Sequence, residues 1–153
     1  LDPMEVATVW LAVDPSRVEN GCMRVIPRSH ANGFSDYEAV ANPEQTVFGT
    51  EIKKGAFDES QAVDLVLNAG ECSIHHAKMI HGSNANKGTL RRCGYTMRFM
   101  PTTVKLTERN ETDAAFQIYL ARGKDRAGNT YGDPSKVNQK WLDRYPDGWP
   151  AGH

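Results

Sequence analysis

The clearest alternation of apolar and polar positions lies between Leu90 and Phe99. Neighbouring residues there belong to two different sets, as the two-residue period of a β-strand requires. The mostly apolar set consists of Arg91, Cys93, Tyr95, Met97 and Phe99, and the polar, cationic set consists of Arg92, Gly94, Thr96 and Arg98. The pattern predicts a strand with two chemically different faces.

Two arrangements of this strand fit its pattern. In the first, the apolar face packs on a core and the polar face is in water, as in an ordinary antiparallel sheet. In the second, the polar face lines the inside of a barrel, where Arg92 or Arg98 can bind an anionic ligand through a bidentate carboxylate pair. Composition alone favours the first arrangement.

Several shorter segments earlier in the chain also have strand character. Residues 5–13 are rich in β-branched and aromatic types and end at Asp14-Pro15-Ser16, which is a turn sequence. Asn20-Gly21 predicts a tight hairpin turn, with residues 22–26 as the return strand. Further strands are predicted over residues 45–52, 62–67 and 71–76.

Helical signals are weaker. Residues 31–43 predict a loop with a short helical turn, and 53–61 predict a polar loop. Residues 112–122 fit either a helix or a strand, and 125–134 fit a loop. Many short strands with turns between them predict a sandwich or a jelly roll.

One short helix is predicted near the end of the chain. Ser135 is its expected N-cap and Arg144 its last residue. Val137, Trp141 and Leu142 are expected to face inward.

The bulk composition predicts a globular protein. At 153 residues the chain has the length of one domain and is expected to bury about two-thirds of its unfolded surface. We expect a single domain over residues 1–153, with a β core over 1–101 and a C-terminal extension over 102–153. The formal net charge of −1 gives no electrostatic basis for a nucleic-acid partner.

Cysteine content and hydropathy bear on the compartment. The three cysteines, Cys22, Cys72 and Cys93, are an odd number without a Cys-x-x-Cys pair, which favours a reducing compartment. There is no apolar run of membrane-spanning length and no signal-peptide pattern, so we expect a cytoplasmic protein with no membrane partner. Because Leu1 is not a methionine, we expect the sequence to be a fragment.

Three of the five histidines, His75, His76 and His81, fall within seven positions. A neutral imidazole, a short turn and then an arginine can form a site in which the histidine binds a divalent metal and the arginine binds the far carboxylate of a chelating acid. His81 and Arg92, eleven positions apart, fit this description. His75 and His76 point to opposite faces of a regular strand, so at most one of them can approach His81.

These residues resemble a motif of the phytanoyl-CoA dioxygenase family. In that family the second metal-binding histidine begins a His-Gly-Ser-x-x-Asn sequence, and an arginine follows eleven residues later. The matching positions are His81, Gly82, Ser83, Asn86 and Arg92. Residues 8–30 resemble a second signature, which usually ends in Pro-Gly-Ser-His, and Arg28 replaces the glycine here.

The resemblance implies a double-stranded β-helix, a cupin-like jelly roll that is mostly β with short peripheral helices. It implies an iron(II)- and 2-oxoglutarate-dependent dioxygenase that uses dioxygen to hydroxylate a small organic substrate. His81 would bind iron, and Arg92, Ser83, Thr8 and Trp10 would contact 2-oxoglutarate. His76 and Arg98 are expected either to support these residues or to contact the substrate.

One part of the family pattern is missing. The first metal motif, His-x-Asp, does not occur in this sequence, and the alignment would place it before Leu1. The N-terminal portion of the fold is therefore expected to be lacking. Three explanations fit this absence. The sequence is part of a longer enzyme, or it is a truncated reading frame that folds as a metal-free β-domain and binds a small molecule or a protein. In the third, another carboxylate completes the site, such as one from a partner chain.

Overall fold

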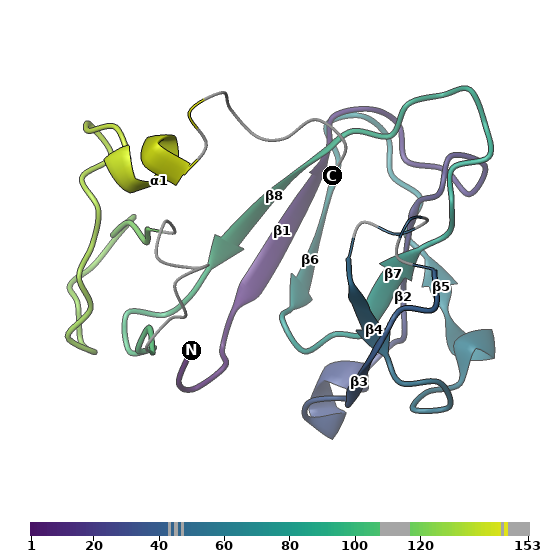
Figure 1. Ribbon diagram of the computed structural model, residues 1–153, viewed down its shortest axis with the longest axis horizontal. Coiled ribbons are helices and arrows are strands. Elements are labelled where there is room, and N and C mark those ends of the chain that lie inside the picture. The colour runs from purple at the N-terminus through teal and green to yellow at the C-terminus, as the bar shows by residue number, and fades with distance from the viewer. Residues whose placement is uncertain (43, 45, 47, 108–116, 145, 147–153) are drawn as a thin grey trace. The chain divides into compact units, whose positions relative to one another are not determined.

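The computed structural model describes residues 1–153 except 43, 45, 47, 108–116, 145 and 147–153 (Figure 1). The chain divides into two compact units, one formed by Val6–Met100 and the other by Leu1–Glu5 with Pro101–His153. Each unit is described separately below. The expectation of a single domain stays a prediction.

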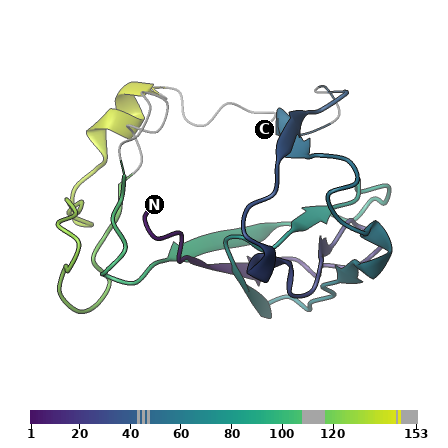
Figure 2. The same ribbon diagram turned by 90° about the horizontal axis from the view of Figure 1, so that it is seen from below.

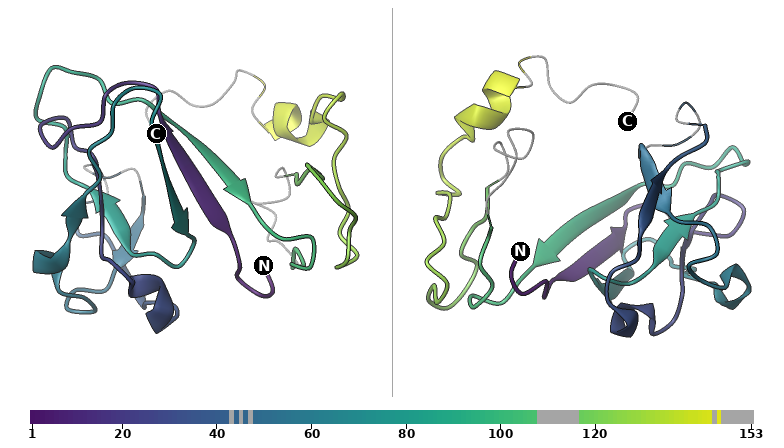
Figure 3. Two further views of the ribbon diagram at one scale, coloured as in Figure 1. Left: turned by 180° about the vertical axis from the view of Figure 1, so that it is seen from behind. Right: turned by 60° about the horizontal axis from the view of Figure 1, so that its bottom comes forward.

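The first sheet of the Val6–Met100 unit is built around β1, Ala7–Ala12. This strand pairs antiparallel with β6, Cys72–His76, on one side and with β8, Gly94–Phe99, on the other, and Figure 3 shows the three strands side by side. The strands predicted over residues 5–13 and 71–76 are confirmed. The predicted strand at 90–99 is confirmed from Gly94 onward.

Burial settles which face of this sheet points inward. Thr8, Trp10 and Ala12 of β1 are buried, whereas Tyr95 and Phe99 of β8 are 60% and 50% exposed. Directly opposed residues of antiparallel strands share a face, and the register pairs Thr8 with Arg98 and Trp10 with Thr96. The polar face of β8 therefore lies on the same side of the sheet as the buried residues of β1, which we call the inner face, although Gly94, Thr96 and Arg98 are themselves exposed. The apolar face of β8 does not pack on the core, so the arrangement favoured by composition alone is wrong.

A second three-stranded sheet has the order β5, Val63–Asp64, then β2, Met23–Val25, then β7, His81–Ser83. The predicted return strand therefore exists, but its expected pairing with the first strand is wrong. Gly21 has a φ of 75°, as the turn prediction requires, and a Cβ on it would lie 2.5 Å from the carbonyl oxygen of Asn84. The turn packs against the loop after β7, and so the chain passes to the second sheet.

The two sheets enclose a small apolar core. Trp10 and Ala12 from the first sheet cluster with Met23 from the second, and Leu65 and Leu67 pack against this cluster. Two antiparallel sheets joined by crossing connections are the arrangement of a jelly roll.

Shorter elements complete this unit. They are η1, Ser29–Asn32; β3, Tyr37–Ala39; β4, Thr50–Ile52; and η3, Glu59–Gln61. The strand β3 was not predicted; it lies in the expected loop and pairs antiparallel with β4. The strand predicted over 45–52 is regular only at its end, and residues 45 and 47 lie outside the described residues. The strand predicted over 62–67 pairs regularly at Val63–Asp64 and continues as a single bridge between Ser16 and Leu67.

The other unit contains little regular structure in its described residues. A bridge joins Asp2 to Lys105, and Val104 is buried. The loop predicted over 125–134 is confirmed, and the carboxylate of Asp125 accepts hydrogen bonds from the backbone N–H of Gly128 and the hydroxyl of Tyr131. Residues 117–122 form neither the helix nor the strand considered for 112–122, and residues 112–116 lie outside the described part.

The single α-helix among the described residues is α1, Gln139–Arg144, and Figure 2 shows it near the end of the chain. It is shorter than predicted. Ser135 belongs to the preceding turn, where its backbone N–H and its hydroxyl both contact Asp133, so it is not the N-cap. Val137 is 72% exposed and Leu142 is 38% exposed, so their expected inward orientation is wrong, and the side chain of Trp141 lies outside the described residues.

Candidate functional site

His81 begins β7 and pairs with Val25 of β2. Its ring is exposed, and its Nδ1 lies 2.7 Å from the carbonyl oxygen of Met79. Because a carbonyl oxygen can only accept a hydrogen bond, Nδ1 carries the proton of the neutral ring. The lone pair of His81 is therefore on Nε2, which is the usual state of a metal-binding histidine whose other nitrogen is held by a backbone carbonyl.

His75 lies beside His81, with the two ring centroids 5.0 Å apart. It is a buried residue of β6, and its Nδ1 is inaccessible and has no hydrogen-bond partner among the described residues. An N–H without an acceptor is costly to bury, so the proton of neutral His75 belongs on Nε2. Burial, followed by the charges of His81 and Arg98, lowers the pKa of His75 and keeps the ring neutral.

The sheet register places His75 in a polar row across the inner face. Thr8 lies between His75 on one neighbouring strand and Arg98 on the other. Two residues further along β1, Trp10 lies between Ser73 and Thr96. The eight inner-face residues of these strands include no carboxylate; they are Thr8, Trp10, Ala12, Ser73, His75, Gly94, Thr96 and Arg98.

Arg92 lies just before β8, and its guanidinium carbon is 5.7 Å from the ring centroid of Trp10. This distance is within the range of a cation–π contact. The indole covers Gly94 so closely that a Cβ there would lie 2.1 Å from a ring atom. Glycine at this position lets the Trp10 ring lie against the backbone of β8, with the guanidinium of Arg92 near it.

Arg91 is held by a different partner, Asp14, at the end of β1. Its Nε and Nη2 donate to the two carboxylate oxygens of Asp14 at 2.7 and 3.0 Å, and the backbone N–H of Cys93 donates to the same carboxylate at 2.9 Å. The hydrogen bond from Arg91 lowers the pKa of Asp14, and the hydrogen bond from the Cys93 N–H lowers it further. Asp14 therefore anchors the start of β8, a role that its place in a turn sequence did not suggest.

The predicted residues are only partly brought together. His81 contacts His75, and Arg92 contacts Trp10; since His75 and Trp10 are both inner-face residues, the side chains of His81 and Arg92 approach the same face. His76 does not join them, because it points the other way and its ring lies 5.7 Å from that of His30. The histidine next to His81 is thus His75, whereas His76 was expected.

Ser83 is exposed and follows His81 by two residues on β7, so the two share a face of that strand. It is paired through the backbone with Met23.

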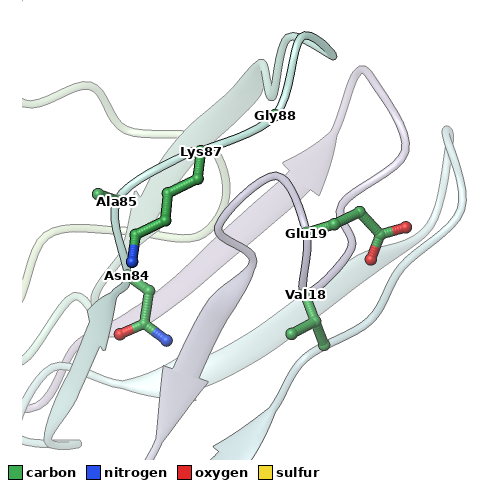
Figure 4. A pocket seen from close by; sticks show the side chains of 6 residues that line it. All are labelled: Val18, Glu19, Asn84, Ala85, Lys87 and Gly88. Atoms are coloured by element: carbon green, nitrogen blue, oxygen red, sulfur yellow. The ribbon is translucent and has the colours of Figure 1, made fainter.

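A shallow pocket of about 720 Å³ lies apart from these residues, between the turn before Cys22 and the loop after β7 (Figure 4). Its lining consists of Val18, Glu19, Asn84, Ala85, Lys87 and Gly88. In Figure 4 the Lys87 side chain runs along the loop toward Asn84, and Glu19 and Val18 come from the opposite turn. None of the predicted site residues lines it.

The metal that the resemblance implies can be compared with these ligands. The tautomer of His81 suits a metal ligand. Among the described residues, however, no three histidine, cysteine or acidic side chains are grouped closely enough to hold a metal ion. The described part of the chain therefore offers one suitable ligand and not a complete set. In the same residues, no helix is long and apolar enough to span a membrane.

Comparison with known proteins finds relatives that are similar to this chain in sequence. A Caenorhabditis elegans phytanoyl-CoA dioxygenase domain-containing protein 1 homolog is 30% identical over 116 residues, which are 72% of this chain and 40% of that protein. The chain thus spans less than half of the length of that relative.

Solved structures share the fold. The non-haem monooxygenase ThoJ, in its apo form, superposes with a TM-score of 0.65 at 25% identity, over 93% of this chain and 50% of ThoJ. EvdO2 from Micromonospora carbonacea var. aurantiaca, solved with 2-oxoglutarate, has a TM-score of 0.57 at 21% identity, over 72% of this chain and 45% of EvdO2. The predicted double-stranded β-helix is confirmed. Residues 1–94 match the phytanoyl-CoA dioxygenase (PhyH) family, and the chain belongs to that family.

Proposed function

We propose that the whole protein is an iron(II)- and 2-oxoglutarate-dependent dioxygenase that hydroxylates a small organic substrate. In this proposal the chain supplies one metal ligand, His81, and the cosubstrate-binding residue, Arg92. One observation carries it: the imidazole of His81 on β7 and the guanidinium of Arg92, just before β8, approach the same inner face. Membership of the family supports the same interpretation.

His81 would bind the metal through Nε2 while Nδ1 stays bonded to the Met79 carbonyl oxygen. The other protein ligands would come from outside the described residues, because these contain no group of three ligands. When bound, the iron would supply the activation of dioxygen that oxidises 2-oxoglutarate and the substrate.

Arg92 would bind the distal carboxylate of 2-oxoglutarate through its planar guanidinium. The Trp10 ring beside it limits the positions that the guanidinium can adopt and excludes water from one side. Thr8 and Ser83 would add hydroxyl groups along the length of the cosubstrate.

The test uses the whole protein, reconstituted with iron(II) without oxygen for the measurement of iron stoichiometry. Succinate formation is then measured after dioxygen and 2-oxoglutarate are added, for the wild type, His81→Ala, Arg92→Gln and the control His30→Ala. We expect loss of iron in the first variant. In the second we expect retained iron and a KM for 2-oxoglutarate that is raised at least about tenfold, because a charge-assisted pair is lost. Full iron binding by His81→Ala would overturn the proposal and favour a metal-free binding domain.

A further inference from the structure

The row formed by His75, Thr8 and Arg98 combines a buried imidazole, a hydroxyl and a guanidinium. His75 is more than nine-tenths buried, and its Nδ1 has no partner in the described part of the chain. The proton of the neutral ring is therefore assigned to Nε2. Nε2–H is then the donor that this ring offers, and the eight inner-face residues of the sheet include no carboxylate.

Arg98 adds a positive charge to the same row. It is exposed, and it lies across Thr8 from His75. An N–H donor, a hydroxyl and a guanidinium, in a row that contains no acid, form a suitable environment for an anionic oxygen.

The second arginine of the inner face is distant from the first. Arg92 and Arg98 are six residues apart along an extended segment, which corresponds to about 20 Å between their backbones. Arg92 lies with Trp10, and Arg98 lies in the row of His75, next to His81. Two cationic groups at separate positions are suited to two separate anions.

We propose that His75 and Arg98 bind an anionic group, a carboxylate or a phosphate, beside His81, and that this group belongs to the primary substrate. The inference rests on the proposed function, since it takes the second anion to be 2-oxoglutarate at Arg92. The substrate class is accordingly that of organic acids and phosphate esters. His75 Nε2–H and the Arg98 guanidinium donate hydrogen bonds to the anion, and Thr8 lies between these two residues.

The test is a titration of the metal-free, 15N-labelled full chain with acetate, inorganic phosphate and 2-oxoglutarate, followed through the histidine ring nitrogens. We expect acetate or phosphate to shift the His75 signals. Arg98→Gln should weaken this effect at least about fivefold, as expected from the loss of a charged donor. Arg92→Gln and the control Arg122→Gln, which changes an exposed arginine of the other unit, should leave it unchanged.

Three outcomes would overturn the proposal. These are no response of His75 to acetate or to phosphate, an Arg98→Gln variant that binds these two probes as the wild type does, or a response to 2-oxoglutarate alone that Arg92→Gln abolishes. The last outcome would assign the anion to the cosubstrate. A folded His75→Phe variant, verified by its amide spectrum, should bind the probes more weakly than the wild type. Because the titration is done without metal, the result is independent of whether the whole protein binds iron.

Discussion

The imidazoles of His75 and His81 lie 5.0 Å apart between ring centroids, and their hydrogen-bond environments assign them opposite tautomers. His81 carries its proton on Nδ1, since that atom contacts the Met79 carbonyl oxygen, and His75 carries its proton on Nε2, since its buried Nδ1 has no partner in the described residues. One ring therefore presents a lone pair and the other an N–H. Side-chain 15N shifts, which distinguish the two tautomers, should show this difference at neutral pH.

The stability of the protein should decrease as the pH falls through the range where imidazoles titrate. Burial lowers the pKa of His75 in the folded state below the ordinary value of about 6.5. The unfolded chain then takes up the proton first, so the free energy of unfolding decreases as the pH drops below about 6.5 and levels off below the folded-state pKa. Thermal unfolding between pH 8 and 5 measures this slope.

A substitution isolates the contribution of His75. His75→Gln should reduce the loss of Tm on acidification, whereas His30→Gln, a change of an exposed histidine, should leave it as in the wild type. An unchanged slope in His75→Gln would show that other groups cause the effect.

Gly94→Ala should destabilise the protein. The added methyl group would meet the Trp10 ring at 2.1 Å, and either the indole or the strand must move, at a cost of about 1–3 kcal/mol in the free energy of unfolding. Urea denaturation measures the change. Gly82→Ala in β7 is the matched control and should cost much less, because no atom of the described residues lies within 4 Å of the point where its methyl group would be.

Asp14→Ala should weaken 2-oxoglutarate binding without affecting iron. Its carboxylate holds Arg91 and the N–H of Cys93, the residues on either side of Arg92. Without these bonds the start of β8 loosens, and we expect the Kd for 2-oxoglutarate to rise roughly two- to tenfold, since only a positioning effect is lost. Calorimetry on the whole protein provides the measurement, with iron stoichiometry alongside.

A control tests whether this effect is specific to the position of Asp14. Asp58→Ala removes a carboxylate that accepts hydrogen bonds from Ser60 within η3, away from β8, and should not change the affinity. Equal weakening by the two variants would mean that the anchoring role of Asp14 is incorrect.

Arg92→Lys should not restore the affinity that Arg92→Gln loses. A lysine keeps the charge but cannot form two parallel hydrogen bonds with a carboxylate, and it stacks less well on an indole. We expect the KM for 2-oxoglutarate to remain at least about fivefold above the wild type. A lysine variant with the wild-type KM would indicate that charge alone is required.

The alternation of β8 was sufficient to predict a strand, and it assigned every residue to the correct set. It could not reveal which set faces inward, because that depends on the burial of Thr8 and Trp10, whose partners Arg98 and Thr96 lie 90 and 86 positions later in the chain. The same limitation applies to His75 and His76. Strand parity shows that they point apart, but only the packing of β6 against β1 determines which one reaches His81.

Long-range pairing also explains what the sequence did not reveal. Asn20-Gly21 does form a turn with a positive φ, yet β2 pairs with β5 and β7, since the turn packs against the loop after β7. The contact between Asp14 and Arg91 joins residues 77 positions apart. Local sequence carries no signal for such a contact until the neighbouring strands are known.

The carbonyl group that orients His81 belongs to Met79, only two residues away, and the N–H of Met79 is in turn bonded to the carbonyl oxygen of His76. A short stretch of backbone thus fixes the proton of His81 on Nδ1 and leaves the lone pair on Nε2 before any metal ion binds. The preference of the His81 ring for metal binding through Nε2 is therefore set by neighbouring residues in the sequence. It should persist even where the other metal ligands come from elsewhere.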